Sequence, residues 1–340
     1  MRAIVLAGGE GTRLRPLTWR TPKPLVPLLN RPLITRLLGH LARHGFDEIT
    51  LALTRRTTVI EEAPGDGSAL GLHLDYAYEE TPLGSGGAIA SIAATWPADR
   101  RETFLVCNGD IVSDLDLTAM LAQHRARRAV LSISLFEVDD PSPFGVADVA
   151  PDGRIRRFVE KPKREDAPSR LINSGFWLFE PSLLAEMDGT TFNRVEDNLF
   201  PAVATSGRPM IGFPHGTYWR DVGNAAALLA ANLDLARAEA PGGILRAGDL
   251  QMAPGARISK PAVIGSGCSI GPGAVVERSV LWDGVTVGPN AVVRDSILAS
   301  GVHVGPGALL EGAIVAHGAA VAPGARLQRV SVEPADPVVA

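Results

Sequence analysis

Short apolar runs alternate with longer amphipathic stretches over about the first 240 residues of the chain. Residues 2–6 are short and apolar, which predicts a buried strand, and residues 104–107 are continuously apolar, as in a strand covered on both faces. Between them, Leu33, Leu37 and Leu41 recur at helical spacing. We expect Asn30-Arg31-Pro32 to open this helix and Gly45 to close it. The alternation indicates an α/β fold.

The remaining elements of this region follow from the same patterns. The sequence predicts further strands at 49–53, 72–77, 129–138, 146–149, 155–159 and 176–179, and helices at 88–96, 115–127 and 224–239. Asp152-Gly153 is typical of a hairpin turn between two of these strands. The four prolines within 15–27 exclude a helix there, so this segment should be extended and irregular.

From about Gly243 the pattern changes to a repeat. Ile270-Gly271-Pro272-Gly273-Ala274 recurs as Val287–Ala291 and Val304–Ala308, and fades to Val321–Ala325, at intervals of about seventeen residues. Aliphatic residues recur roughly every six positions within each unit. This pattern predicts a hexapeptide-repeat solenoid of four to five coils, because a β-sandwich does not repeat in register. We therefore expect two domains, 1–242 and 243–340.

Composition limits the partners. The chain has 340 residues, 46% of them hydrophobic, and a formal net charge of −4, which gives no basic surface for nucleic acid or an anionic membrane. Only two cysteines occur, and neither a secretory leader nor an apolar run long enough for a membrane span is expected. These features favour a soluble protein in the reducing cytoplasm.

A glycine-rich loop follows the first strand. Leu6-Ala7-Gly8-Gly9-Glu10-Gly11-Thr12-Arg13-Leu14 lacks side chains where a backbone could approach a phosphate, and Thr12 and Arg13 add a hydroxyl and a positive charge. Open α/β sheets bind nucleotides at the carboxyl ends of their strands. A tight turn without a ligand is the alternative.

Further candidate residues lie at other loops. Lys23 stands between Pro22 and Pro24, which fix its backbone, although a solvated lysine is the commoner outcome. A second glycine-rich turn, Glu79–Gly87, could support a flat base. Asp110 and Asp221 each follow an apolar strand and could hold one magnesium ion whose shell substrate phosphates complete. Aspartates also cap helices, so the pairing alone is weak.

Seven motifs in order resemble the sugar-1-phosphate nucleotidyltransferases over nearly the whole chain, and the repeat resembles their left-handed β-helix. The motifs are Gly8–Leu14, Pro22-Lys23-Pro24, Pro82–Gly87, Asn108-Gly109-Asp110, Glu160-Lys161-Pro162, Asn173-Ser174-Gly175 and Trp219–Gly223. The resemblance implies a Rossmann-like, three-layer domain with a mixed, mostly parallel sheet. It also implies transfer of a nucleotidyl group from a nucleoside triphosphate to a sugar 1-phosphate.

The resemblance further implies residue roles. Leu6, Ala7, Gly8, Gly9, Gly11, Thr12 and Arg13 would bind the nucleotide, Leu83, Gly84 and Gly87 its base, and Gly145, Glu160, Lys161 and Asn173 the sugar phosphate. Arg13 would stabilise the leaving pyrophosphate and Lys23 the α-phosphate. Asp110 is implied in nucleotide binding and catalysis, Asp221 in substrate binding, and both in holding Mg²⁺.

Pro22-Lys23-Pro24-Leu25 resembles the mannose-1-phosphate and heptose-1-phosphate guanylyltransferases, which favours GTP. Thymidylyl-, uridylyl- or adenylyl transfer to glucose 1-phosphate stays open, because Ser85-Gly86 stands where many relatives have threonine-alanine.

Two other classes of function compete. A non-catalytic regulatory homologue should have lost Asp110, Asp221, Lys23 or Lys161, and all four are present. A solenoid that acylates the sugar would need its histidines, but we expect exposed coil positions for His303 and His317. We expect the solenoid to serve contact between subunits of a homo-oligomer, or regulation, rather than acylation.

Overall fold

The computed structural model describes residues 1–97, 99, 101–216 and 218–333. The chain forms two compact units. The first comprises Met1–Gly9 and Ile34–Trp219, and the second comprises Glu10–Leu33 and the chain from Arg220 onward. The glycine-rich loop therefore divides between the units after Gly9. The predicted limit between residues 242 and 243 stays a prediction.

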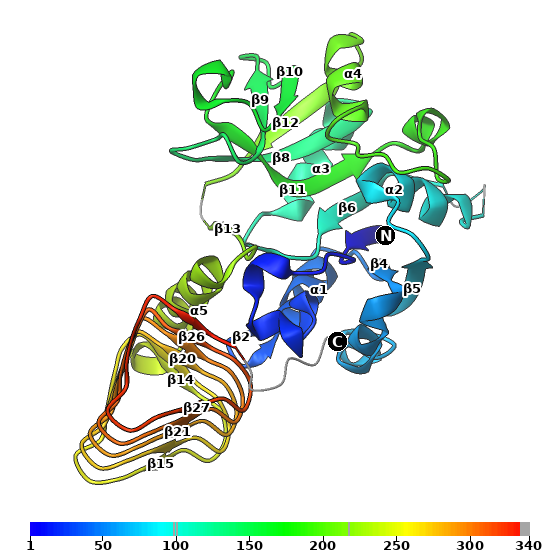
Figure 1. Ribbon diagram of the computed structural model, residues 1–340. Helices are drawn as coiled ribbons and strands as arrows, with labels where there is room; N and C mark the ends of the chain where they lie inside the picture. The colour runs from blue at the N-terminus through cyan, green and yellow to red at the C-terminus, as the bar shows by residue number, and fades with distance from the viewer. Residues whose placement is uncertain (98, 100, 217, 334–340) are drawn as a thin grey trace. The chain divides into compact units, whose positions relative to one another are not determined.

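A mixed sheet forms the centre of the first unit (Figure 1). Its strands run in the order β10-β9-β11-β6-β1-β4-β5, with β8 beside β11 and β12 beside β8. Parallel pairs join β6, β1, β4 and β5, so their carboxyl ends share one edge. The strands are β1 (Arg2–Leu6), β4 (Glu48–Thr54), β5 (His73–Glu79), β6 (Phe104–Asn108), β8 (Leu131–Glu137), β9 (Gly145–Val149), β10 (Ile155–Glu160), β11 (Leu171–Phe179) and β12 (Met210–Pro214).

Helices cover both faces of this sheet. The α-helices of this region are α1 (Leu33–Arg43), α2 (Gly84–Ala94), α3 (Leu117–Ala126) and α4 (Leu199–Thr205). Ile89 of α2 and Phe200 of α4 share one buried cluster with Trp177 of β11. The ring of His40 in α1 lies 6.2 Å from that of Phe176, which points to the opposite face because side chains alternate along a strand. The Rossmann-like, three-layer prediction is confirmed.

Several local predictions need correction. The helix predicted to open at Asn30–Pro32 begins at Leu33, because β2 (Pro27–Leu28) and β3 (Arg31–Pro32) form a small hairpin first. The helix predicted from residue 88 begins at Gly84, inside the glycine-rich turn. The proline-rich segment contains no α-helix, as predicted, but it folds into short 3₁₀ turns at Leu17–Trp19 and Lys23–Leu25, after a similar turn at Thr12–Leu14 in the glycine-rich loop.

The motif Asn173-Ser174-Gly175 lies inside β11 rather than before it. The pairing register with β8 breaks between Asn173 and Trp177, and Gly175 adopts φ +85°, which favours glycine. The amide oxygen of Asn173 accepts hydrogen bonds from the Gly175 N–H and from Trp177 Nε1. The break therefore gives the polar motif a fixed shape inside an otherwise apolar strand.

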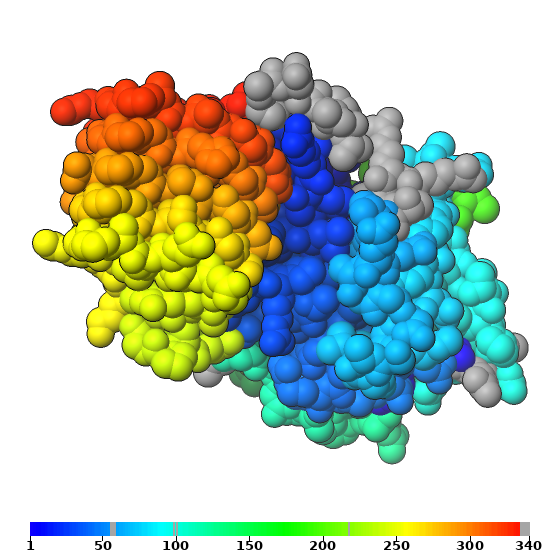
Figure 2. Space-filling view, turned by 90° about the horizontal axis from the view of Figure 1, so that it is seen from below, coloured from blue at the N-terminus to red at the C-terminus, as the bar shows by residue number. Residues whose placement is uncertain are grey.

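The second unit contains the predicted parallel β-helix, whose stacked coils run from yellow to red in Figure 2. Its first sheet joins β14, β17, β20, β23, β26 and β29, its second β15, β18, β21, β24 and β27, and its third β16, β19, β22, β25 and β28. Ile270, Val287, Val304 and Val321 pair in one ladder, as the repeat predicted. Helix α5 (Ala225–Glu239) contacts β14, β17 and β20.

The strands of the coils are two or three residues long. They are β14 (Ile244–Arg246), β15 (Gln251–Met252), β16 (Arg257–Ser259), β17 (Ala262–Ile264), β18 (Ser269–Ile270), β19 (Val275–Glu277), β20 (Val280–Leu281), β21 (Thr286–Val287), β22 (Val292–Arg294), β23 (Ile297–Leu298), β24 (His303–Val304), β25 (Leu309–Glu311), β26 (Ile314–Val315), β27 (Ala320–Val321), β28 (Arg326–Gln328) and β29 (Ser331–Val332). Two further short strands occur before the β-helix, β7 (Ile111–Ser113) and β13 (Trp219–Asp221).

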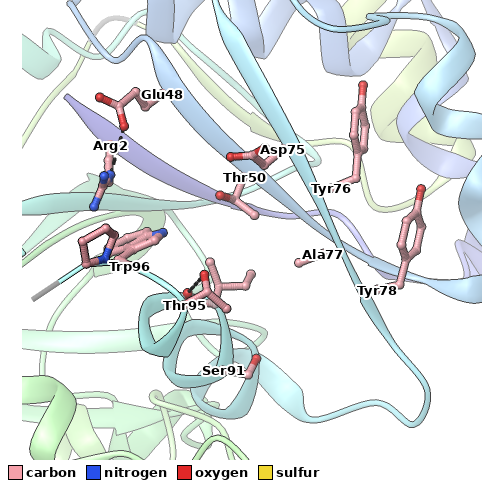
Figure 3. Close-up of a pocket in the computed structure, with 12 residues that line it drawn as sticks. Arg2, Glu48, Thr50, Asp75, Tyr76, Ala77, Tyr78, Ser91, Thr95 and Trp96 are labelled. Carbon is pink, nitrogen blue, oxygen red and sulfur yellow. Dashed lines mark hydrogen bonds and ion pairs between the residues drawn. The ribbon is translucent and has the colours of Figure 1, made fainter. Parts of the chain in front are cut away.

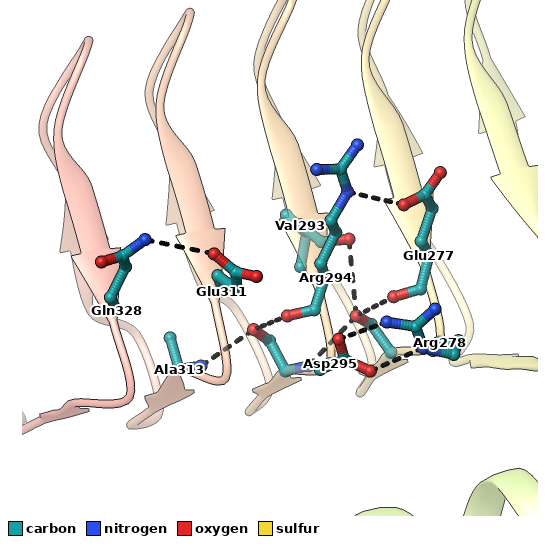
Figure 4. A network of polar contacts seen from close by, with 10 residues as sticks. Glu277, Arg278, Val293, Arg294, Asp295, Glu311, Ala313 and Gln328 are labelled. Carbon is teal, nitrogen blue, oxygen red and sulfur yellow. Dashed lines mark hydrogen bonds and ion pairs between the residues drawn. The ribbon is translucent and has the colours of Figure 1, made fainter.

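Side chains continue the ladder outside the coils (Figure 4). Arg278 donates to both carboxylate oxygens of Asp295, 2.7 and 2.6 Å away, one coil further on. Inside the same corner, Ser279 Oγ accepts from the Ser296 N–H, and Ser296 Oγ accepts from the Ala313 N–H. These bonds fix the register between coils, because each satisfies a polar group that the turn would otherwise bury.

Candidate active site

The first unit places the start of the glycine-rich loop at the carboxyl end of β1. Leu6 ends the strand, and the Ala7 N–H donates to the Ala52 carbonyl across to β4. A Cβ added to Gly8 would lie 3.3 Å from Thr54 Cγ2, whereas a Cβ at Gly9 would meet nothing within 4 Å. Gly9 is thus an exposed backbone position with open space beside it.

Asp110 is fixed beside this loop through its neighbour Gly109. The Gly109 N–H donates to the Leu6 carbonyl at 2.9 Å, and a Cβ at Gly109 would lie 3.0 Å from Ala7 Cβ. No larger residue fits without displacing the start of the loop. Gly109, the residue before Asp110, and the loop that follows β1 are therefore neighbours at one edge of the sheet.

The second glycine-rich turn is covered by the loop 188–196. The Gly86 N–H donates to the Asn193 carbonyl at 3.0 Å, and the Asn193 N–H donates to the Leu83 carbonyl at 2.9 Å. A Cβ at Gly86 would overlap Asn193 Oδ1, and one at Gly87 would lie 3.0 Å from the Thr191 carbonyl. Gly86 is a glycine here because the covering loop leaves no room for a side chain.

A pocket of about 270 Å³ opens beside this turn. Its lining includes Leu83, Glu79, Glu80 and Thr81 from the turn and Thr190 from the covering loop. Glu79 Oε2 accepts from the Leu83 N–H at 3.1 Å, and burial raises the pKa of this carboxyl. The pocket combines apolar walls with carboxylate acceptors.

The residues predicted to bind the sugar phosphate also converge within the first unit. Gly145 and Glu160 are paired across the β9–β10 ladder. A Cβ at Gly145 would overlap the Phe158 ring and lie 2.7 Å from Glu160 Oε2. Lys161 Nζ lies 3.7 Å from Glu160 Oε1. Gly145 is a glycine here because the Phe158 ring and the Glu160 carboxylate pack directly against its backbone.

Asn173 offers a defined group at this position. Because its amide oxygen already accepts two hydrogen bonds, from the Gly175 N–H at 3.0 Å and Trp177 Nε1 at 2.7 Å, the NH₂ group is what it can offer a ligand. These two bonds also fix the orientation of the Asn173 amide, because only its oxygen can accept them.

The second unit carries the other predicted site residues. Gly11 has φ +64°, and a Cβ there would lie 3.0 Å from Lys23 Cβ. Arg13 and Asp221 meet at another glycine, because a Cβ at Gly223 would lie 2.9 Å from Arg13 Nη2 and 3.0 Å from Asp221 Oδ1. Thr12 is exposed beside Arg13.

Two aspartates are the candidate ligands for a divalent cation. No group of three or more His, Cys, Asp or Glu residues that could hold a metal occurs among the described residues. Asp110 and Asp221 supply hard carboxylate oxygens, at positions where Gly109 and Gly223 fix the adjacent backbone. Each carboxylate by itself is a ligand of the kind that Mg²⁺ takes, since this ion typically binds one or two protein carboxylates and completes its shell with water and substrate phosphates.

Sequence reasoning missed a polar network next to these residues. Arg194 Nη2 donates to Glu160 Oε1 at 3.1 Å and lies 3.8 Å from Glu196 Oε1. Ser85 Oγ donates to Glu196 Oε2 at 2.5 Å, and the Val195 N–H donates to Ser85 Oγ. Nothing local marked Arg194, because Glu160 is 34 residues away in the sequence.

A larger pocket of about 690 Å³ lies elsewhere in the first unit (Figure 3). Arg2 and Glu48 line it, at the amino ends of β1 and β4, together with Asp75 and Trp96. Arg2 donates to Glu48 at 3.1 Å, and its guanidinium lies 5.1 Å from the Trp96 ring centroid. None of the predicted site residues lines this pocket.

Known proteins with similar sequences show which family the chain belongs to. A family described as nucleotidyl transferase matches residues 2–238, and a family described as GMPPB C-terminal domain matches residues 243–339. A mannose-1-phosphate guanylyltransferase of Mycobacterium tuberculosis is 37% identical, over 82% of this chain and 79% of the relative. A UTP–glucose-1-phosphate uridylyltransferase of Synechocystis is 32% identical, over 83% of each chain. A probable mannose-1-phosphate guanylyltransferase 2 of Arabidopsis thaliana is 34% identical, over 80% of this chain and 75% of the relative.

The fold and the site define a nucleotide-dependent transferase of the α/β class. The chain belongs to the nucleotidyl transferase family, and the resemblance to sugar-1-phosphate nucleotidyltransferases that its motifs indicated is confirmed. None of the described helices is long and apolar enough to cross a membrane.

Proposed function

We propose that this enzyme transfers a guanylyl group from GTP to a mannose-type sugar 1-phosphate, releasing pyrophosphate. The observation that carries the proposal is the contact of Gly109 with Leu6 and Ala7, which brings the backbone next to Asp110 beside the glycine-rich loop. The names of two similar proteins, both mannose-1-phosphate guanylyltransferases, support the choice of substrates. A heptose 1-phosphate is a second candidate for the sugar.

The reaction is an in-line displacement at the α-phosphorus. An oxygen of the sugar phosphate forms a bond to that phosphorus, and the bond from the α-phosphorus to the bridging oxygen breaks, so that pyrophosphate leaves with the electron pair. No covalent enzyme intermediate is required. The work of the protein is therefore to position two anions and to balance charge.

Within the first unit we assign the sugar phosphate to the strands β9, β10 and β11. Lys161 binds the phosphate, while Glu160 Oε2, the backbone of Gly145 and the Asn173 NH₂ group bind sugar hydroxyls. The close approach of Glu160 Oε2 to the Gly145 backbone, across the β9–β10 pair, supports assigning these two groups to one ligand. The backbone from Leu6 to Gly9 binds the nucleotide phosphates, because glycine allows close approach.

Within the second unit we assign the phosphate chemistry to Arg13 and Lys23. Arg13 stabilises the charge that develops on the leaving pyrophosphate, Lys23 lies at the α-phosphate, and Gly11 and Thr12 complete the loop. Asp221, and Asp110 of the first unit, are the proposed ligands of Mg²⁺. When bound, this ion supplies a Lewis acid and a template for the phosphates.

The pocket beside Leu83 and Gly84 is our candidate for the base. Guanine presents N–H donors on one edge, and Glu79 and Glu80 line the pocket with carboxylate acceptors. Uracil offers one such donor. The uridylyltransferase among the similar proteins keeps UTP with glucose 1-phosphate as the second candidate.

The test is a matrix of nucleoside triphosphates and sugar 1-phosphates with the purified protein and Mg²⁺. We expect pyrophosphate release to be fastest with GTP and mannose 1-phosphate. Asp110→Ala should abolish release while circular dichroism stays unchanged. Release that is faster with UTP and glucose 1-phosphate would replace the proposed substrates, and no release with any pair would overturn the proposal.

Two further proposals concern the setting. We place the enzyme in the cytoplasm, where nucleoside triphosphates are available. We also propose a homo-oligomer, through the β-helix or the first unit, which sedimentation can test.

A further inference from the structure

Arg194 joins the predicted sugar-binding carboxylate to a second buried carboxylate. Its Nη2 donates to Glu160 Oε1 at 3.1 Å and lies 3.8 Å from Glu196 Oε1, while Nη1 lies 3.5 Å from Asp197. The Glu160 side chain is 14% exposed and that of Glu196 is 11% exposed. A cation that serves two buried carboxylates differs from an exposed surface ion pair, which contributes little.

The two oxygens of Glu160 have different surroundings. Oε1 accepts from Arg194 and lies 3.7 Å from Lys161 Nζ. Oε2 lies against the backbone of Gly145, where an added Cβ would be only 2.7 Å away. Arg194 thus holds one oxygen, and the other lies beside Gly145 of β9.

The same contact bears on Lys161. Among the described residues, Arg194 and Lys161 are the two cations that pair with Glu160 Oε1. If Arg194 were removed, the ammonium of Lys161 would be left as the partner of this oxygen. An ammonium that pairs closely with Glu160 is less able to bind a phosphate. Arg194 therefore satisfies the carboxylate that would otherwise compete for Lys161.

The position of Arg194 is itself fixed from the second glycine-rich turn. Glu196 Oε2 accepts from Ser85 Oγ at 2.5 Å, and Ser85 Oγ accepts from the Val195 N–H at 3.1 Å. The polar chain Ser85–Glu196–Arg194–Glu160 runs from the turn to β10. Each member has a partner on both sides, so the guanidinium has a defined direction.

We infer that Arg194 is a positioning residue for sugar recognition: it orients Glu160 so that Oε2 reads a sugar hydroxyl, and it keeps Lys161 available for the phosphate. This inference rests on the proposed function. Arg194 acts through Glu160 and makes no contact with the reacting atoms in this account. Its loss should therefore weaken binding of the sugar phosphate more than it slows the chemical step.

The test compares Arg194→Met with Arg194→Lys, and with Arg208→Met as the control. Arg208 donates to Ser206 and, at 3.0 Å, to Glu186 in the same unit, and neither partner is a predicted site residue. We expect Arg194→Met to raise the KM for mannose 1-phosphate roughly tenfold, as for loss of a charge-assisted hydrogen bond. The KM for GTP should change less than twofold, and lysine should restore part of the loss.

A double-mutant cycle and deoxy substrates separate this role from a structural one. In a Glu160→Gln background, Arg194→Met should have little further effect, because the group on which it acts is already changed. The monodeoxy mannose 1-phosphate that lacks the hydroxyl bound by Glu160 should bind weakly to the wild type. Arg194→Met should bind this analogue no more weakly, because the contact that Arg194 supports is already missing.

Two results would overturn the inference. Equal behaviour of Arg194→Met and Arg208→Met, with an active wild type, would reject it while the proposed function stands. An additive cycle would show that Arg194 does not act through Glu160. Failure of the wild type to turn over any substrate pair would reject the proposed function, and this inference with it.

Discussion

Thr21 Oγ1 lies 3.0 Å from Nε2 of His317, so the segment that carries Lys23 is bonded to a coil of the β-helix. The same segment is held by Trp19 Nε1, which donates to Glu333, and by Asn30 Nδ2, which donates to the Ile264 carbonyl. The solenoid is therefore part of the support of this loop. The sequence predicted exposed coil positions for both coil histidines, which holds for His303 but not for the half-buried His317.

Replacement of His317 by phenylalanine should loosen this segment. The ring would keep its place beside Trp282, 5.2 Å away, but the bond to Thr21 would be lost. We expect the free energy of unfolding to fall by about 1 kcal/mol and the KM for the nucleoside triphosphate to rise severalfold. Urea unfolding and steady-state kinetics measure both. The exposed His303→Phe is the control, and equal results for the two variants would contradict the prediction.

Gly86→Ala should destabilise the protein although it adds a better helix former to α2. The added Cβ would overlap Asn193 Oδ1, and moving that amide breaks its bonds to the Asp188 and Thr191 carbonyls. We expect a loss of about 1–2 kcal/mol in the free energy of unfolding.

Two variants control this experiment. In Gly39→Ala, where the nearest atom to the added Cβ is 3.9 Å away, stability should rise by about 0.5–1 kcal/mol. In an Asn193→Ala background, Gly86→Ala should become nearly neutral. If the cost persists without the Asn193 side chain, the proposed clash is not its cause.

Gly9→Ala tests whether a nucleotide approaches the loop backbone. A Cβ at Gly9 meets nothing within 4 Å in the protein, so unfolding should change by less than about 0.5 kcal/mol. A phosphate close to this backbone would meet the new methyl group, and we expect affinity for the triphosphate to fall roughly tenfold. Titration calorimetry measures this, with Gly216→Ala, which also has open space, as the control. Unchanged affinity would place the phosphates elsewhere.

His40 should make the protein sensitive to acid. Burial, with the nearby charges of His44 and Arg43, lowers the pKa of His40 to about 4. The unfolded chain, with a histidine pKa near 6.5, binds a proton that the folded state does not, so stability falls as the pH drops from about 6.5 to 4. The expected loss between pH 7 and pH 5 is about 2 kcal/mol from this group.

Urea unfolding of His40→Leu at the two pH values measures the contribution. The variant should lose about 2 kcal/mol less than the wild type on acidification, whereas the exposed His73→Leu should behave as the wild type does. A wild-type loss that His40→Leu leaves unchanged would assign the acid sensitivity to other groups.

Local patterns were enough to predict much of this protein from its sequence. The apolar run 104–107, the Asp152-Gly153 hairpin and the ladder from Ile270 to Val321 were all predicted correctly, because strand burial, turn chemistry and coil stacking depend on neighbours or on a fixed repeat. The ordered motifs likewise indicated the family.

Packing between distant segments decided the rest. The sequence did not show that Glu10–Leu33 would belong to the same compact unit as the β-helix, that Asn193 would cover Gly86, or that Arg194 would hold Glu160. Each depends on which surfaces meet after the chain has folded. Residue type and spacing restrict such contacts but do not select them, because many pairings of polar and small residues satisfy the same local pattern.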